Sequence, residues 1–325
     1  MKLEKQLKEQ KKTNEFTNLM YEEKIMTASN ARIAAAPISW GVCEVPGWGH
    51  QMSPNRVLSE MAQLGFSATE IGPEGFLPME PATKAAILKE HNMIAVGGFV
   101  PVILHQKDHD PLVGVKKELE GYAAAGAKTL VLAANSGISG YDEKLPVLTE
   151  DQWELLFTNL NRIQAEAAKI GVESVLHPHV GTMVETAKHV MRVVKGSTIP
   201  FCLDTGHMMI GGTNVVEFSK EWANRIAHSH LKDVNKKVAQ RVISGEITYY
   251  EGVTKGLYTP LGNGDADIRS IVRNLIMGGY NGWFVLEQDN VVTSEPGNGA
   301  GPFADAKASV EFLRKVLAEL TSEGF

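Results

Sequence analysis

Metal-binding side chains follow four consecutive segments of the chain that have the composition of buried strands. Five of the 10 histidines lie at these segment ends, together with one aspartate and one glutamate. Imidazole and carboxylate together suit Mn, Co, Fe or Zn, and carboxylate-rich sites favour Mn or Mg. A single histidine at a strand end is ordinarily a satisfied polar residue, but four successive strands that end this way favour a metal site. The side chains are His177 and His179, Asp204 and His207, His228 and His230, and Glu287.

The spacing within each segment indicates which side chains can face the same way. Residues two apart in a strand point to the same side, so His228 and His230 can both face inward. His177 and His179 can do so as well if their strand extends that far, and the choice of ligand between these two stays open. We expect one divalent metal ion, with Mn or Co ahead of Mg, Fe and Zn. The expected ligands are His177, Asp204, His230 and Glu287.

Short apolar runs alternate with longer amphipathic stretches from residue 32 onward. Strands that alternate with helices indicate a parallel sheet, because parallel strands need crossover connections. Eight such units predict a closed (β/α)8 barrel, whose active site forms at the carboxyl ends of the strands. The expected strands are Ile33–Ile38, Ala68–Ile71, Ile94–Phe99, Thr129–Ala133, Glu173–His177, Phe201–Asp204, Ile226–Leu231 and Trp283–Glu287. The expected helices are Pro54–Leu64, Ala82–His91, Leu112–Ala125, Glu150–Ile170, Val184–Val194, Val215–Asn224, Ile268–Met277 and Ala304–Leu320.

An open, doubly wound sheet is the alternative architecture. Such a sheet usually carries a glycine-rich nucleotide-binding turn after its first strand. The chain has Trp40, Gly41, Val42 and Cys43 at that place, which is not the fingerprint. The sequence therefore favours the closed barrel.

Two segments depart from the barrel pattern. Residues 1–31 are rich in Lys, Glu and Gln, and we expect a charged arm outside a single barrel of residues 32–325. The arm is either mobile or used for oligomerisation. The connection 232–264 is long, and such connections are usually functional or disordered. It carries several glycines with Tyr249, Tyr250 and Tyr258. We expect a lid over the active site, with a disordered or oligomer-contacting loop as the alternative.

The composition excludes several classes of protein. The 325 residues carry a formal net charge of −6 and are 43% hydrophobic, which is ordinary for a globular protein and offers no basic surface for nucleic acid. No apolar run is long enough for a membrane span, and no signal-peptide core is visible. The two cysteines, Cys43 and Cys202, make no disulfide framework. We expect a cytoplasmic protein with neither a nucleic-acid nor a membrane partner.

Five strings of residues resemble the inosose dehydratase group of the xylose-isomerase-like TIM barrels, a superfamily that also contains sugar phosphate isomerases and epimerases. The strings are residues 36–40, 177–182, 203–207, 228–234 and 282–287. The resemblance implies dehydration of a keto-inositol (2-keto-myo-inositol, or inosose) and a metal set of Glu, Asp, His and Glu from four strand ends. That set falls on His177, Asp204, His230 and Glu287, so a histidine replaces the first glutamate of most members.

This departure bears on the type of reaction. Ketose epimerases of the superfamily use two ligand glutamates, one on each face of the reacting carbon, and this chain keeps only Glu287. An elimination needs one base and one acid, so the resemblance favours a lyase. A keto-sugar isomerase or epimerase is the second interpretation. A lyase that cleaves 3-keto-glycosides with a partner subunit is the third, and a homo-oligomer is expected in each case.

The reaction assigns provisional roles to individual side chains. A metal ion polarises a ketone and so stabilises the enolate that forms when a neighbouring proton is removed. We expect Glu287 to act as the base, and His207 or His179 to protonate the leaving hydroxyl. Lys232 is expected to hold the enolate oxygen or a hydroxyl, or else to pair with Asp233 or another carboxylate. The expected substrate-binding residues are Glu70, Trp40, Asn135 and His228, with solvated loop charge or core packing as their alternative roles.

Overall fold

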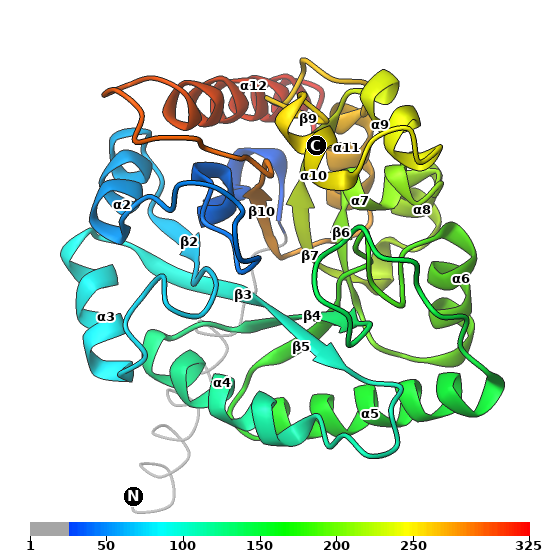
Figure 1. The fold of residues 1–325 in the computed structure, drawn as a ribbon. Helices are drawn as coiled ribbons and strands as arrows, with labels where there is room; N and C mark the ends of the chain where they lie inside the picture. The colour runs from blue at the N-terminus through cyan, green and yellow to red at the C-terminus, as the bar shows by residue number, and fades with distance from the viewer. Residues whose placement is uncertain (1–25) are drawn as a thin grey trace, which may run out of the picture.

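The computed structural model describes residues 26–325, in which parallel strands close into a barrel (Figure 1). The order around the barrel is β1, β10, β7, β6, β5, β4, β3 and β2, and β1 pairs with both β10 and β2. The predicted (β/α)8 barrel is therefore confirmed. The barrel strands are β1 Arg32–Ala35, β2 Ala68–Glu70, β3 Ile94–Ile103, β4 Thr129–Asn135, β5 Glu173–Leu176, β6 Phe201–Asp204, β7 Ile226–Leu231 and β10 Trp283–Leu286.

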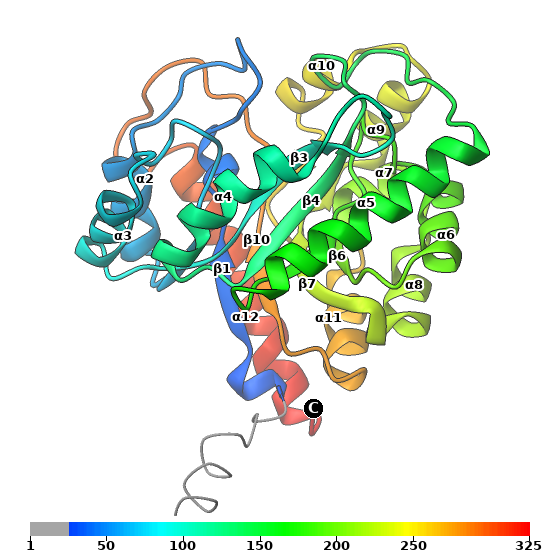
Figure 2. The same ribbon diagram turned by 90° about the horizontal axis from the view of Figure 1, so that it is seen from below.

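Helices surround the strands, as Figures 1 and 2 show from two directions. Several begin with a side-chain cap, because Ser53, Thr149 and Thr186 each accept a hydrogen bond from a backbone N–H of the first turn. No helix in the described part of the chain is long and apolar enough to cross a membrane. The outer helices are α2 Pro54–Gln63, α3 Pro81–Glu90, α4 Leu112–Ala125, α5 Glu150–Ala168, α6 Ala187–Gly196, α8 Val215–Glu221, α11 Ile268–Met277 and α12 Pro302–Ser322.

Both faces of the barrel strands are buried, because helices cover the outer face and the closed sheet encloses the inner one. In β4, Leu130 and Leu132 belong to the main core with the helices, whereas Val131 packs with Val175 and Cys202. A second group of small side chains comes from β1, β2, β3 and β10. These groups fill the barrel beneath the carboxyl ends of the strands, where the polar residues follow.

Some strand ends differ from the expected ones. β1 stops at Ala35 because Pro37 begins a 3-10 helix, η2 (Pro37–Trp40). β3 continues past the expected end at Phe99 to Ile103, since it stays paired with β4 up to Asn135. β5 stops at Leu176, so His177 and His179 lie in the loop that follows the strand.

The last residues of the expected N-terminal arm pack against the barrel. Met26 and Ala28 are buried, and a 3-10 helix, η1 (Ala28–Asn30), contacts α12. The backbone N–H of Ala28 donates to the carbonyl of Phe325 at 3.3 Å. Residues 26–31 therefore belong to the folded unit, and the rest of the expected arm, residues 1–25, lies outside the described residues.

The connection 232–264 is folded rather than a plain loop. It forms an antiparallel pair, β8 (Asp233–Val234) and β9 (Tyr258–Thr259), and two helices, α9 (Lys236–Ile243) and α10 (Tyr249–Thr254). Asn235 and Thr248 cap these helices, and the glycine-rich composition hid both signals. Its apolar side chains pack with Trp48, Val180 and Ile210 at the top of the barrel. None of its residues lines the cavity described below, so the expected lid role stays a prediction.

Asp233 fixes the end of this folded connection. Its two carboxylate oxygens accept hydrogen bonds from the backbone N–H groups of Val234, Gly262, Gly264 and Ala266, at 2.8–3.0 Å. The side chain is 1% exposed. Hydrogen bonds to a buried charged group are among the stronger ones in proteins, so this carboxylate stabilises the return of the chain to the barrel.

Replacing Asp233 with Asn should lower the free energy of unfolding by roughly 3 kcal/mol. The asparagine NH2 group cannot accept hydrogen bonds, so it would face backbone N–H donors that lose their acceptor. Chemical denaturation measures this. The matched control is Asp265→Asn, whose exposed carboxylate accepts one hydrogen bond from Lys236 N and whose loss should cost about 1 kcal/mol or less. Equal losses in both variants would contradict the anchoring role.

Candidate metal centre

Asp204 joins the end of β6 to the candidate metal centre. It is the N-cap of α7 (Thr205–Ile210), and its Oδ1 accepts hydrogen bonds from Gly206 N at 2.8 Å and His207 N at 2.7 Å. Its Oδ2 lies 3.3 Å from His177 Nε2 and 3.7 Å from His230 Nδ1. The helix cap therefore orients one oxygen and leaves the other among the imidazoles.

His230 lies between two carboxylates. Its Nδ1 is 2.8 Å from Glu287 Oε2, and its Nε2 is 2.9 Å from Glu70 Oε1. The same Glu70 oxygen lies 2.8 Å from His228 Nε2. A carboxylate behind a ligating histidine fixes the ring's orientation and tautomer. Glu70 and His228 therefore position His230. His228 is fully buried and does not line the cavity described below, which corrects the expectation that it binds a substrate hydroxyl. Glu70 does line that cavity, so its expected contact with substrate stays a prediction.

The expected ligand set fits a divalent ion. Ligand atoms of Asp204, His230 and Glu287 lie within 4.8 Å of one another, and so do those of His177, Asp204 and His207. His230 Nδ1 is buried and faces both Glu287 Oε2, at 2.8 Å, and Asp204 Oδ2, at 3.7 Å. One imidazole nitrogen and two carboxylates around a common point are a donor set that suits a divalent ion, which would take the place of the imidazole proton. The structure thus brings His177, Asp204, His230 and Glu287 together, with His177 rather than His179 beside Asp204.

The local charge also calls for a cation. Burial by itself lowers the pKa of His230, but the negative groups around it, Glu287 and Glu70 among them, hold that pKa well above its ordinary value. Burial raises the pKa of Glu287, and the charges of His230 and Lys232 outweigh this effect and lower it to about 2. The carboxylates therefore stay ionised and attract positive charge at the position between them.

Lys232 neutralises part of this negative charge. Its Nζ lies 2.7 Å from Asp289 Oδ1, 2.9 Å from Glu287 Oε1 and 3.4 Å from Asp204 Oδ2. It is 0% exposed and does not line the cavity described below, so the expectation that it holds the substrate is corrected. The alternative role, a pair with a carboxylate, is the observed one. Its partner is not Asp233, which binds backbone N–H groups instead.

Asp289 is a site residue that we did not expect from the sequence. It lies in the loop after β10, two residues beyond Glu287, and is 7% exposed. Besides the Lys232 contact, its Oδ2 accepts a hydrogen bond from Tyr249 Oη at 2.5 Å. The signal that could have found it is the two-residue spacing, which places both side chains on one side of an extended chain.

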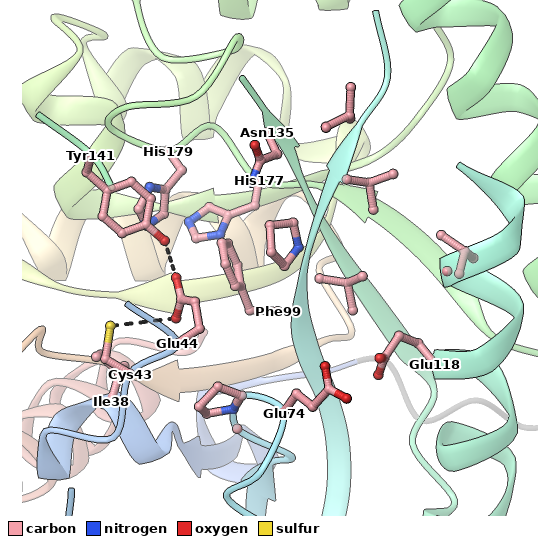
Figure 3. A pocket seen from close by; sticks show the side chains of 18 of the residues that line it. Ile38, Cys43, Glu44, Glu74, Phe99, Glu118, Asn135, Tyr141, His177 and His179 are labelled. Atoms are coloured by element: carbon pink, nitrogen blue, oxygen red, sulfur yellow. Dashed lines mark hydrogen bonds between the residues drawn. The ribbon is translucent and has the colours of Figure 1, made fainter. Parts of the chain in front are cut away.

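A cavity of about 770 Å³ opens above the metal centre (Figure 3). His177 and Glu287 belong to its wall, and Asp204 and His230 are buried behind them. Asn135, at the end of β4, lines the cavity as expected. Trp40 does not: it is fully buried, and its Nε1 donates to Glu60 Oε2 at 2.8 Å. Trp48 is the tryptophan that lines the cavity.

Either His207 or His179 was expected to donate a proton, and the surroundings of both rings disfavour this. His207 does not line the cavity, and its Nε2 lies 3.0 Å from Lys232 Nζ. Burial lowers the pKa of His207 well below its usual range and that of His179 to about 4, and the charge of Lys232 adds to both shifts. Both rings are therefore neutral at neutral pH. Only His179 faces the cavity, and its Nδ1 lies 2.7 Å from the Val180 carbonyl.

Comparison with known proteins places this architecture in a family. Residues 58–316 match the family model described as xylose isomerase-like TIM barrel. The chain belongs to the xylose isomerase-like TIM barrel family, as its strand-end motifs predicted.

Two relatives are similar over nearly their whole length. An inosose dehydratase of Geobacillus kaustophilus is 30% identical over 90% of this chain and 97% of its own. The rhizopine catabolism protein MocC of Rhizobium meliloti is 32% identical over 88% of this chain and 89% of its own. Among solved structures, the IOLI protein with a bound zinc atom superimposes with a TM-score of 0.64 at 13% identity, covering 89% of this chain and 99% of that one. That likeness concerns the fold alone.

Replacing Lys232 with Met should destabilise the metal-free protein by about 3–5 kcal/mol, because three buried carboxylates lose their shared counter-charge. The variant keeps the length of the side chain, and denaturant unfolding measures the loss. Lys255→Met is the control, since its exposed pair with Glu251 should contribute less than about 0.5 kcal/mol. If the two variants unfold alike, Lys232 is not the counter-charge.

Proposed function

We propose that this protein is a metal-dependent lyase that removes water from a keto-inositol. The observation that carries the proposal is the convergence of His177, Asp204, His230 and Glu287 at the base of a cavity large enough for a sugar-like ring. The similarity to an inosose dehydratase over most of both chains supports the choice of substrate.

The four ligands define what a bound ion contributes. Two neutral imidazoles and two carboxylates balance a divalent charge, and this mix favours Mn or Co. A divalent ion held there supplies Lewis-acid polarisation of the substrate ketone, which makes the neighbouring C–H more acidic. The solved relative with a bound zinc atom supports the presence of an ion on this fold without deciding which metal acts here.

We assign removal of the proton to His179 rather than to Glu287. Both oxygens of Glu287 are engaged, one by Lys232 Nζ at 2.9 Å and one beside His230 Nδ1 at 2.8 Å. His179 Nδ1–H donates to the Val180 carbonyl, which leaves the Nε2 lone pair as a proton acceptor in the cavity wall. Glu287 then serves as a ligand, and His179 takes the proton next to the ketone.

Asn135 and Trp48 provide the contacts expected for a polyhydroxylated ring. The Asn135 Oδ1 accepts a hydrogen bond from Gly137 N at 2.6 Å, which leaves its amide N–H groups to donate to a substrate hydroxyl. Trp48 is held by a hydrogen bond from its Nε1 to the Asn290 carbonyl at 3.0 Å. Its indole supplies an apolar wall for the C–H face of the ring.

The volume of the cavity favours one alternative. The lining continues beyond the metal centre along β3 to Val113 and Glu118 of α4, which is more space than a single ring fills. A lyase acting on a 3-keto-glycoside, with its aglycone in this extension, is therefore the second candidate. Epimerisation is less favoured, because His177 replaces a carboxylate that would act on the opposite face of the reacting carbon.

Removing the metal with a chelator should lower turnover of 2-keto-myo-inositol by more than about 100-fold, and Mn or Co should restore it. Mass spectrometry of the product separates the candidates: loss of one water supports dehydration, unchanged mass supports epimerisation, and release of an aglycone from a keto-glycoside supports the second candidate. Asp204→Asn should stay inactive with added metal. Full activity in metal-free protein or in this variant would refute the proposed centre.

The assignment of the base has its own test. His179→Gln should slow the exchange of the proton next to the ketone with deuterium from solvent by about 100-fold or more, as the loss of a general base does. At saturating Mn, the Glu287→Gln variant should exchange this proton faster than the His179→Gln variant does. The opposite ranking, read by proton NMR, would return the base role to Glu287.

A further inference from the structure

Two ionisable side chains on the rim of the cavity have no part in the metal centre. The Tyr141 hydroxyl donates a hydrogen bond to Glu44 Oε1, and both residues line the cavity (Figure 3). Glu44 belongs to the loop after η2 and Tyr141 to the loop after β4, so the fold brings together residues from distant parts of the chain. We call Tyr141 and Glu44 the rim pair.

The position of Tyr141 is fixed on several sides. Its ring packs against the His179 ring at 4.8 Å between centroids and against the edge of Tyr249 at 5.9 Å. Its backbone lies against Gly181, where a Cβ would come within 2.7 Å of the Tyr141 Cα. Gly181 also has φ +74°, so the close approach and the backbone conformation both require glycine there. The phenol is therefore held beside the proposed base.

An elimination needs a second proton transfer, because hydroxide is a poor leaving group. The groups around the metal centre are committed: His177 and Glu287 are expected ligands, and Asp289 is engaged by Lys232 and Tyr249. His179 donates its Nδ1–H to the Val180 carbonyl and is assigned to take the C–H proton. A phenol carries a proton at neutral pH, and burial together with Glu44 raises the pKa of Tyr141 well above its ordinary value.

We propose that Tyr141 is the general acid that protonates the departing hydroxyl, and that Glu44 positions it. The inference rests on the proposed function and extends it. His179 removes the C–H proton, and that electron pair moves to the ketone as an enolate. The enolate electrons then form the C=C bond as the neighbouring C–O bond breaks. For this transfer the single O–H of Tyr141 turns from Glu44 Oε1 to the leaving oxygen, which takes the phenolic proton and departs as water.

Glu44 also connects this acid to solvent. Its side chain is exposed, while Tyr141 is half-buried between the loops. After water has left, the Glu44 carboxylate takes a proton from solvent and passes it to the Tyr141 phenolate. His179 releases its proton to solvent. The net change is the loss of one water from the substrate. Glu44 is therefore a positioning and relay residue, and Tyr141 is the group that touches the reacting oxygen.

The test separates the two proton transfers. Tyr141→Phe keeps the ring that packs on His179 and Tyr249 but removes the acid. With manganese-loaded protein and 2-keto-myo-inositol, we expect kcat for dehydration to fall by about 100- to 10,000-fold. Exchange of the proton next to the ketone with solvent deuterium should stay within a few-fold of the wild type, because His179 is retained. Thermal melting checks that the variant is folded.

A substrate analogue with fluorine in place of the departing hydroxyl provides the rescue, because fluoride leaves without a proton. Tyr141→Phe should release fluoride at a rate close to that of the wild type, and Glu44→Gln should show the same rescue with a smaller loss on the natural leaving group. Tyr250→Phe is the matched control, since this exposed tyrosine packs on Trp48 outside the cavity lining.

The possible outcomes are distinct. Wild-type dehydration in Tyr141→Phe, parallel loss of exchange and dehydration, or failure of the fluoro analogue to restore turnover would each overturn the role of Tyr141. A wild-type protein that neither exchanges nor dehydrates would refute the proposed function and this inference together. Selective loss of dehydration with rescue by fluoride would support both.

Discussion

Mutual repulsion among buried carboxylates is the constraint that this site has to satisfy. Asp204, Glu287 and Asp289 all lie within 3.4 Å of the single ammonium of Lys232. Like charges interact strongly away from water, so these groups stay ionised only where positive charge is supplied. Lys232 supplies part of it, and His230 or a bound cation supplies more. The negative charge that attracts a metal ion therefore also destabilises the metal-free fold, and Lys232 reduces this destabilisation.

The expected ligands are held by backbone structure rather than by long, flexible chains. His177 N donates to Leu132 O at 2.7 Å and Glu287 N to Leu231 O at 3.1 Å, so each ligand remains tied to the neighbouring strand. Asp204 is fixed by the start of α7. Sites built on such rigid elements keep their geometry better than sites on loops. The cavity wall, by contrast, draws Glu44, Tyr141 and His179 from connecting segments.

The sequence predicted the barrel and the proximity of the candidate ligands, because both follow from periodicity and from where strands end. It predicted individual roles less well. Trp40 and Trp48 are both near β1, and only tertiary packing decides that the first is buried against Glu60 and the second faces the cavity. Glu70 was visible as a strand-end carboxylate, but its partners His228 and His230 are far away in the sequence. The pairing of Tyr141 with Glu44 likewise depends on loop conformations that carry no periodic signal.

The separation of ligands from cavity wall has an evolutionary consequence. The candidate metal ligands lie at or next to strand ends, whereas much of the remaining cavity wall comes from the loops after β1, β2, β4 and β5. Loops tolerate insertion and replacement far better than barrel strands do. A lineage can therefore exchange one substrate for another by remodelling these loops while the candidate metal ligands stay unchanged. The same division would let protein engineers change substrate specificity by replacing these loops, without altering the residues of the candidate metal centre.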